Sequence, residues 1–220
     1  MSEEMKTDRI AVFGGSGLVG RELIAAALAR GLQVKALYRP GSEPQGQTKG
    51  LEVITGQLTE SPKIRQALEG TMGAICVFGP RLGKRNNPQP FCADATGRII
   101  EEMKKLDMER IIVQTGAMAG GDSPNWSWFV RRFVKSYRKN YPEIDKDRDA
   151  QEAVTKASGL DWTITRTFRI SGGKGTGNVR VLENVRISFF THTPRPDFAN
   201  FLLGELANGT HHRKTVYVVK

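Results

Sequence analysis

Short apolar runs alternate with amphipathic segments along this chain. The apolar runs have the length and composition of buried strands, and they cover residues 10–13, 33–38, 51–54, 73–78, 110–114 and 161–167. Segments with apolar residues at helical spacing lie at 18–30, 62–68, 91–106 and 144–157. Through residue 114 the pattern predicts the order βαβαβαβαβ, which winds into a parallel sheet with helices on both faces. We expect one Rossmann-type, doubly wound α/β domain over residues 1–220.

The chain after residue 114 is less regular. Apolar and mostly aromatic residues between 126 and 141 recur at helical spacing, and Asp122 or Ser123 can cap this helix with Pro124 in its first turn. We expect the aromatic stripe to be core, and the alternative is a substrate lid in which Trp126 and Trp128 stack on a planar ligand. The tail completes the substrate side from about residue 168, with a strand pair around 179–188, a helix near 196–206 and a last strand at 215–219.

Charge is the most unusual feature of the composition. The chain carries 33 Lys and Arg against 23 Asp and Glu, a net charge of +10. Five of the basic residues lie on the polar face of the aromatic helix: Arg131, Arg132, Lys135, Arg138 and Lys139. Such charge suits nucleic acid, an anionic membrane surface or a phosphate site. Because the chain shows neither a nucleic-acid module nor an apolar run of about 20 residues, we expect a solvated surface, with neither nucleic acid nor a membrane as partner.

The cysteines and histidines form no disulfide or metal pattern. Cys76 and Cys92 are not a CxxC pair, and His192, His211 and His212 have no ligand spacing with them. The first residues are polar and lack the apolar stretch of a secretory leader. We therefore expect no metal and a reducing, cytoplasmic setting.

One glycine-rich segment carries the chemistry. In IAVFGGSGLVGREL, Gly14, Gly17 and Gly20 lie between an expected strand and an expected helix. This context is typical of a dinucleotide-binding turn, with Gly14 for the tight turn, Gly17 for the approach of the pyrophosphate and Gly20 for close packing. The first amides of the helix, at Leu18 and Val19, and the Ser16 hydroxyl can donate to the pyrophosphate. The alternative is a structural glycine turn.

The residue after the second strand indicates which cofactor binds. A carboxylate there accepts hydrogen bonds from the ribose 2′-hydroxyl of NADH, but this chain has Arg39. A guanidinium is a charge-assisted partner for the 2′-phosphate of NADPH, so we expect NADPH. Lys49 can reinforce the phosphate site or be a solvated loop charge, and Arg39 itself can be a surface arginine.

Several segments resemble one family. The turn GGSGLVG, the YR that ends the second strand, TGQLTE after the third and SGLDWTITR before the sixth are similar to the atypical short-chain dehydrogenase/reductases. This group includes NmrA-type proteins and biliverdin IXβ/flavin reductases, and the resemblance spans nearly the whole chain. It implies an adenine contact at Gln57 and Leu58, although the family usually has Asp in place of Gln57. It also implies that the cofactor is lined by Phe78, Gly79, Pro80, Thr115, Gly116, Thr167 and Phe168.

The catalytic residues of the better-known branch are absent. A Tyr-xxx-Lys pair is missing, because Tyr137 is followed four residues later by Tyr141, and Tyr141 by Asp145. The resemblance places Arg148 and Glu152 where family members often carry a lysine and a glutamate. Arg148 stays protonated near neutral pH, so it can bind an anionic group or the nicotinamide ribose but cannot act as an acid. For Glu152 the alternative is a structural ion pair.

The substrate is not defined by the resemblance. Similar biliverdin/flavin reductases have a serine and a histidine where this chain has Gly116 and Glu152, and Thr115 becomes the hydroxyl nearest to the expected nicotinamide. We expect an NADPH-dependent oxidoreductase that reduces a small planar or anionic acceptor such as a flavin, a quinone or a related carbonyl compound. The alternative is a non-catalytic NADP(H)-binding sensor or assembly factor of NmrA type. We expect a monomer or a homodimer.

Overall fold

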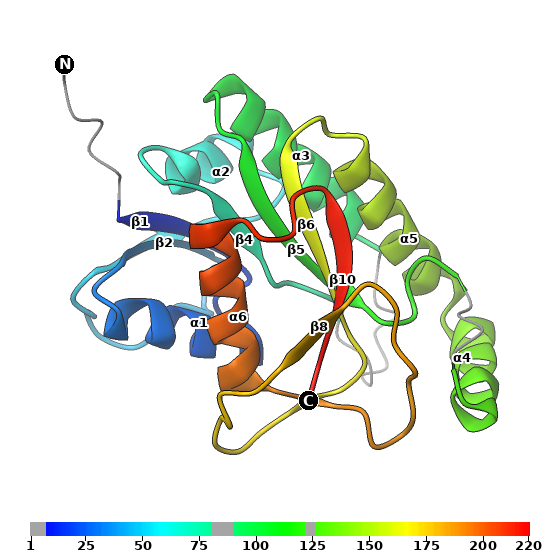
Figure 1. The fold of residues 1–220 in the computed structure, drawn as a ribbon. Coiled ribbons are helices and arrows are strands. Elements are labelled where there is room, and N and C mark those ends of the chain that lie inside the picture. Colours follow the sequence, from blue (N-terminus) through cyan, green and yellow to red (C-terminus); the bar gives the residue numbers. More distant parts are fainter. Residues whose placement is uncertain (1–7, 81–89, 122–125) are drawn as a thin grey trace.

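The computed structural model describes residues 8–80, 90–121 and 126–220, and an eight-stranded sheet forms its centre (Figure 1). The strand order is β3-β2-β1-β4-β5-β6-β10-β8. The strands are β1 (Arg9–Phe13), β2 (Gln33–Tyr38), β3 (Leu51–Thr55), β4 (Ala74–Cys76), β5 (Arg110–Gly116), β6 (Asp161–Thr167), β8 (Arg180–Leu182) and β10 (Lys214–Val219). The pairs are parallel except β8 with β10. The predicted doubly wound α/β fold is confirmed, with one antiparallel edge strand.

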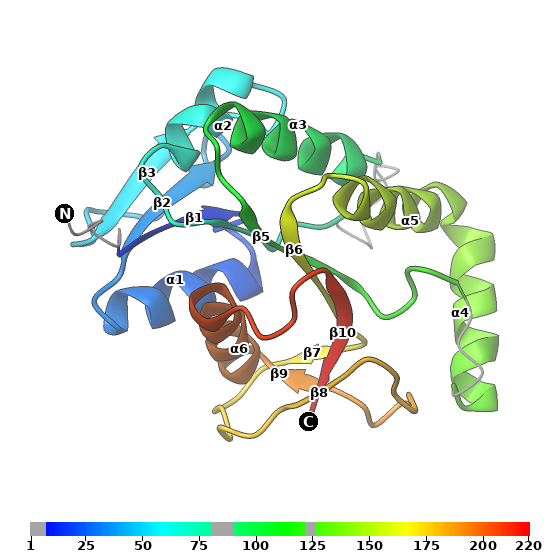
Figure 2. The same ribbon diagram turned by 45° about the horizontal axis from the view of Figure 1, so that its top comes forward.

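Helices cover both faces of the sheet (Figure 2). One face is covered by α1 (Leu18–Ala29) and α6 (Arg195–Asn208), whose buried residues Leu23 and Phe198 share a core cluster with Val12. The other face carries α2 (Ser61–Leu68), α3 (Cys92–Lys105) and α5 (Pro142–Lys156). Both layers are needed because strands that are apolar on both sides must be buried on both sides.

Two sequence-based expectations about the connections are wrong. The expected βαβαβαβαβ order includes a helix between the second and third strands, but residues 39–50 there are a loop, as their Gly, Pro and Gln content predicts. The expected strand pair around 179–188 does not form either, because β8 pairs with β10 at the edge of the sheet. A separate two-stranded sheet joins β7 (Ile170–Ser171) to β9 (Thr193–Pro194).

Helix α4 (Trp128–Asn140) begins later than expected, and the predicted caps Asp122 and Ser123 lie outside the described residues. Ser127 caps the helix instead, since its hydroxyl accepts a hydrogen bond from the Val130 amide at 3.4 Å. The helix lies at one edge of the molecule beside α5 (Figures 1 and 2). Only a narrow side of it is covered, at Val130 and Val134, which pack against the segment around Val185.

The aromatic stripe is therefore core only in part. Trp126, just before α4, is buried, but Trp128, Phe129 and Phe133 are exposed. The expectation of a buried stripe is wrong for Phe129 and Phe133, because no element lies over that side of α4 in the described part of the chain. Within residues 8–80, 90–121 and 126–220, none of the helices combines the length and the apolar character needed to span a bilayer.

Candidate functional site

The glycine turn connects β1 to α1 through positions that exclude a side chain. Gly14 has φ +100°, and a Cβ there would lie 2.8 Å from the Phe78 amide nitrogen. A Cβ on Gly20 would meet the carbonyl oxygen of Gly14 and lie 2.8 Å from its carbonyl carbon. The Gly17 amide donates to the Gly14 carbonyl at 3.0 Å, which closes the turn. The backbone of this turn is thus held tightly between two strands and a helix, as close helix–strand packing requires.

The turn leaves the start of α1 open to an anion. Gly17 is the N-cap and supplies no side-chain hydrogen bond, so the first amides, at Leu18 and Val19, have no partner inside the helix. The first turn contains no acidic residue that would compete for them, and Ser16 is half-buried beside them. A cradle of bare amides at the positive end of a helix dipole fits a pyrophosphate.

An open pocket of about 460 Å³ lies at the ends of β2 and β3. It adjoins the glycine turn through Tyr38, whose ring lies 3.0 Å from the position of a Cβ on Gly15. Its lining residues are Arg39, Pro40, Gly41, Ser42 and Gln57. The Ser42 hydroxyl donates to the Arg39 carbonyl at 2.8 Å, which shapes the loop. The Arg39 side chain is exposed and has no hydrogen bond or ion pair among the described residues. The structure therefore brings a free guanidinium and a side-chain amide together.

The other residues predicted after β3 are placed differently. Leu58 packs against the core cluster of α2 and α3. The backbone amide of Gln57 donates to the Glu60 carboxylate at 2.5 Å, so that carboxylate fixes the turn before α2. Lys49 does not line the pocket.

Arg148 on α5 lies against the chain after β4. Its Nη1 donates to Gln151 Oε1 at 2.7 Å and to the carbonyl oxygens of Gln114 and Phe78 at 3.4 and 3.5 Å. A Cβ on Gly79 would meet the Arg148 Nη2, so a side chain there would displace the guanidinium from this position. Pro80 is half-buried at the end of the described segment. Arg148 thus joins the ends of β4 and β5 to α5.

Thr115 and Glu152 lie in one buried network. The Thr115 hydroxyl donates to Glu152 Oε1 at 2.9 Å, and Arg166 donates to both Glu152 oxygens at 2.8 and 2.6 Å. Lys156 pairs with the same carboxylate at 3.0 Å. Burial raises the pKa of Glu152, but the hydrogen bonds and charges of Arg166 and Lys156 outweigh it, so that pKa lies below its usual value. Glu152 is therefore an ionised carboxylate that cannot donate a proton at neutral pH.

Sequence reasoning did not select Arg166 for the site. Besides Glu152, it donates to the Tyr217 hydroxyl at 3.0 Å, and it lies 5.5 Å from the centre of the Tyr217 ring. Arg166 is the last residue of the segment SGLDWTITR, so the signal was present, but its partners lie 14 and 51 residues away. Only the packing of α5 and β10 on β6 brings them together.

The ends of β5 and β6 complete this edge of the sheet. Gly116 pairs with Thr167, and the Ala117 amide donates to the Thr167 carbonyl at 2.9 Å. A Cβ on Gly116 would meet no atom of the described residues within 4 Å, so a ligand or a larger side chain has room beside them. Phe168 is half-buried against the cluster that contains Trp126. All of the predicted cofactor residues follow, or end, the carboxyl ends of parallel strands, where α/β sheets bind their ligands.

The two cysteines are core residues. Cys76 and Cys92 are buried and unpaired, and burial raises the pKa of Cys92 to about 12. The thiols are therefore protonated and unreactive at neutral pH. No group of three possible metal ligands occurs in the described residues.

The fold and the open glycine turn define a dinucleotide-binding protein of Rossmann type. A family model described as NAD(P)H-binding matches residues 14–209, and the chain belongs to that family. The predicted NAD(P)-binding family is thereby confirmed, and this is consistent with the resemblance to atypical short-chain dehydrogenase/reductases.

Solved structures share the fold. A short-chain dehydrogenase/reductase of Veillonella parvula, in complex with NADP, superimposes with a TM-score of 0.79 at 15% identity, over 96% of this chain and 94% of that one. ChuY, an anaerobilin reductase of Escherichia coli O157:H7, superimposes with a TM-score of 0.76 at 21% identity, over 96% of each chain. At these identities the likeness is evidence for the fold alone.

Curated relatives match this chain over only part of their own length. An uncharacterised chloroplast protein of Arabidopsis thaliana is 22% identical over 182 residues, which are 80% of this chain and 64% of that protein. Sterol demethylase protein B of Methylococcus capsulatus is 27% identical over 170 residues, which are 73% of this chain and 51% of that protein. The chain thus spans less than two thirds of the length of these relatives.

Proposed function

We propose that this protein is an NADPH-dependent oxidoreductase that reduces a small planar acceptor such as a flavin, a quinone or a related carbonyl compound. The observation that carries the proposal is the open glycine cradle with the Arg39 pocket beside it. The amides of Leu18 and Val19 would hold the pyrophosphate, and the positions around Phe78 and Gly116 would lie along the nicotinamide half.

The preference for NADPH follows from the chemistry of the pocket. A guanidinium without a protein partner is suited to a 2′-phosphate, with Ser42 and Gln57 as neutral neighbours. A plain ribose hydroxyl would leave most of the Arg39 donors without a charged acceptor. In the described residues no carboxylate lines the pocket to receive that hydroxyl.

The acceptor class follows from the buried network. The Thr115 hydroxyl donates a hydrogen bond to Glu152, and Arg166 keeps the Glu152 carboxylate ionised. Neither residue is therefore a proton donor for a substrate. When bound, the nicotinamide supplies a hydride. The residues present orient the reactants, while the reduced acceptor takes its proton from solvent. Flat, electron-poor acceptors meet this requirement because their reduced oxygen or nitrogen atoms protonate readily.

A kinetic assay tests the proposal. Pure protein is mixed with NADPH and a panel of flavins, quinones and carbonyl compounds, and the absorbance of the reduced nicotinamide is followed. We expect loss of absorbance that depends on both the protein and the acceptor. Tyr137→Phe serves as a control for the source of the proton, because a solvent proton predicts a rate within about twofold of the original. A loss of 100-fold or more would instead identify Tyr137 as the acid.

The same network also favours a second function. A site whose hydroxyl and carboxylate satisfy each other suits a non-catalytic NADP(H)-binding sensor or assembly factor of NmrA type. Such a protein binds NADPH without turnover of any acceptor. Tight binding in calorimetry together with no turnover across the panel would favour it, and absence of nucleotide binding would refute both functions.

The setting we propose is reducing and cytoplasmic, because both cysteines are unpaired and buried. The substrate is a planar or anionic small molecule, and the working unit is a monomer or a homodimer. Size-exclusion chromatography with light scattering checks the last point.

A further inference from the structure

Helix α4 carries large aromatic side chains that face solvent. The exposed fractions are 65% for Trp128, 63% for Phe129 and 45% for Phe133, and the neighbouring segment adds Phe189 at 45% and Phe190 at 86%. We call these five residues the aromatic edge. The rings of Phe133 and Phe189 lie 6.0 Å apart, so the helix and the segment form one surface. A contiguous group of exposed rings on a soluble fold marks an interaction site.

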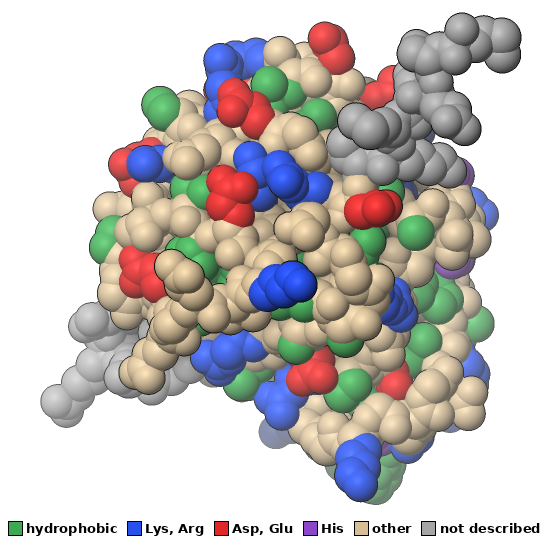
Figure 3. Space-filling view, turned by 90° about the vertical axis from the view of Figure 1, so that its left-hand side faces the viewer, with side chains coloured by type: hydrophobic (Ala, Val, Ile, Leu, Met, Phe, Trp, Pro, Cys, Tyr) green, Lys and Arg blue, Asp and Glu red, His purple; other side chains and the backbone are tan. Residues whose placement is uncertain are grey.

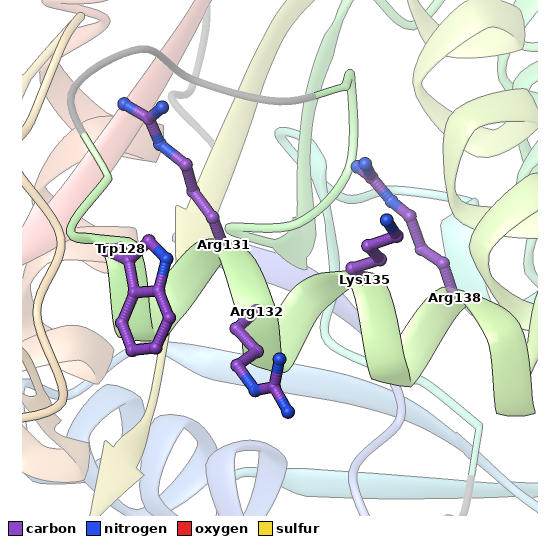
Figure 4. A pocket seen from close by; sticks show the side chains of 5 residues that line it. All are labelled: Trp128, Arg131, Arg132, Lys135 and Arg138. Carbon is purple, nitrogen blue, oxygen red and sulfur yellow. The ribbon is translucent and has the colours of Figure 1, made fainter.

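The same helix is strongly basic. It contains five cations and no acidic residue: Arg131, Arg132, Lys135, Arg138 and Lys139. On the far face of the molecule, by contrast, Figure 3 shows acidic side chains mixed with basic ones. Trp128 and four of the cations line an open pocket of about 530 Å³ along the helix (Figure 4). The local surface is thus positive and aromatic at once.

Not all of these cations are available to a partner. Arg131 donates to the Trp126 carbonyl at 3.1 Å, and Arg138 pairs with Asp145 at 3.0 Å, so both also hold α4 in place. The side chains of Arg132 and Lys135 are exposed and form no hydrogen bond or ion pair with another described residue. They, with Lys139, are the charges that a partner would meet.

We propose that the aromatic edge and the basic face of α4 form a docking surface for an anionic lipid bilayer. A helix with Trp and Phe beside Lys and Arg lies in the interface of a membrane, with its rings among the acyl chains and its cations at the headgroups. Nucleic acid fits less well, because base stacking needs open ring faces, whereas Trp128 and Phe129 pack edge to face at 4.8 Å. The sequence alone indicated no membrane partner, because it showed neither a span nor which rings are exposed. The proposal is independent of the proposed reductase activity.

Trp128 provides a direct measurement. The other tryptophans, Trp126 and Trp162, are 3% and 9% exposed, so only Trp128 can enter a bilayer without unfolding. The protein of residues 1–220 is mixed with vesicles of phosphatidylcholine, with or without phosphatidylglycerol, that carry brominated acyl chains. We expect binding and quenching of tryptophan fluorescence with anionic vesicles only, and weaker binding at high salt. In Trp128→Phe the quenching should disappear while flotation with the vesicles persists.

Charge variants provide the second test. Each surface cation contributes about fivefold to binding of an anionic membrane, so Arg132→Glu with Lys135→Glu should weaken vesicle binding by at least about 25-fold. The matched control, Lys63→Glu with Lys104→Glu, changes the net charge equally on α2 and α3 and should retain vesicle binding to within about threefold. Equal loss in both variants would overturn the proposal, as would binding without quenching of Trp128. Failure of the original protein to bind vesicles would also overturn the proposal. If the protein instead binds a DNA duplex or an acidic polypeptide, and the α4 variant loses that binding, the surface serves a different partner and the proposal is wrong.

Discussion

Replacing Arg39 by alanine should weaken NADPH binding about tenfold and leave NADH binding within about twofold. Hydrogen bonds to a charged group contribute about 1.5–3 kcal/mol each, but the Arg39 side chain is exposed in an open pocket and is screened by salt. We therefore take the low end, about 1.5 kcal/mol, which is slightly more than a factor of ten in Kd. Isothermal titration of each nucleotide at low and at physiological salt measures both constants.

Two controls make this measurement decisive. Lys49→Ala removes a loop cation that does not line the pocket, so its effect on NADPH should stay below about twofold. Arg39→Asp should go further and reverse the preference, because a carboxylate accepts from the ribose hydroxyl and repels the phosphate. An equal loss of NADPH and NADH affinity in Arg39→Ala would show that this residue supports the fold and does not read the 2′-phosphate.

Three further predictions concern stability. Gly14→Ala should lower the free energy of unfolding by more than about 2 kcal/mol, against about 1 kcal/mol for Gly31→Ala, because both have positive φ but only Gly14 is crowded by neighbouring backbone. Equal losses in denaturant titrations would refute this. Asp147→Ala should lower the free energy of unfolding by about 2 kcal/mol, because the Asp147 carboxylate accepts hydrogen bonds from three backbone amides at the start of α3. A loss of helix content that leaves the free energy of unfolding unchanged would contradict this prediction. Burial raises the pKa of Glu205, but hydrogen bonds led by His211 outweigh it and bring the pKa to about 2. Its stabilisation is thus present above about pH 4.5 and lost as the pH falls towards 2, so Glu205→Gln should flatten the pH dependence of unfolding in that window.

The sheet and the glycine turn were predictable because their signals are local. Six apolar runs bounded by glycines and polar loops could only be buried strands, and Gly14 to Gly20 stand between a strand and a helix in the chain itself. The free guanidinium of Arg39 at the end of β2 was also accessible, since parallel strands bring their carboxyl ends to one edge.

The surroundings of α4 and of Glu152 were not predictable in this way. Helical spacing requires that one face be covered, but it does not report how wide the covering elements are, so Phe129 and Phe133 were wrongly expected in the core. The partners of Glu152 lie on β5 and β6 as well as on its own helix. Their meeting depends on strand register and helix docking, which one sequence does not encode locally.

The pair Arg148 and Glu152 gains a physical explanation from this network. The two residues lie one turn apart on α5, and each bonds to a different part of the sheet edge: Arg148 to the carbonyls of Phe78 and Gln114, Glu152 to the Thr115 hydroxyl and to Arg166. In the function we propose, α5 therefore fixes the chain segments along which a nicotinamide ring would lie. A pair that resembles a family catalytic pair then acts by orienting the cofactor. The proposed hydride transfer is thus compatible with a site in which Thr115 already donates a hydrogen bond to an ionised Glu152.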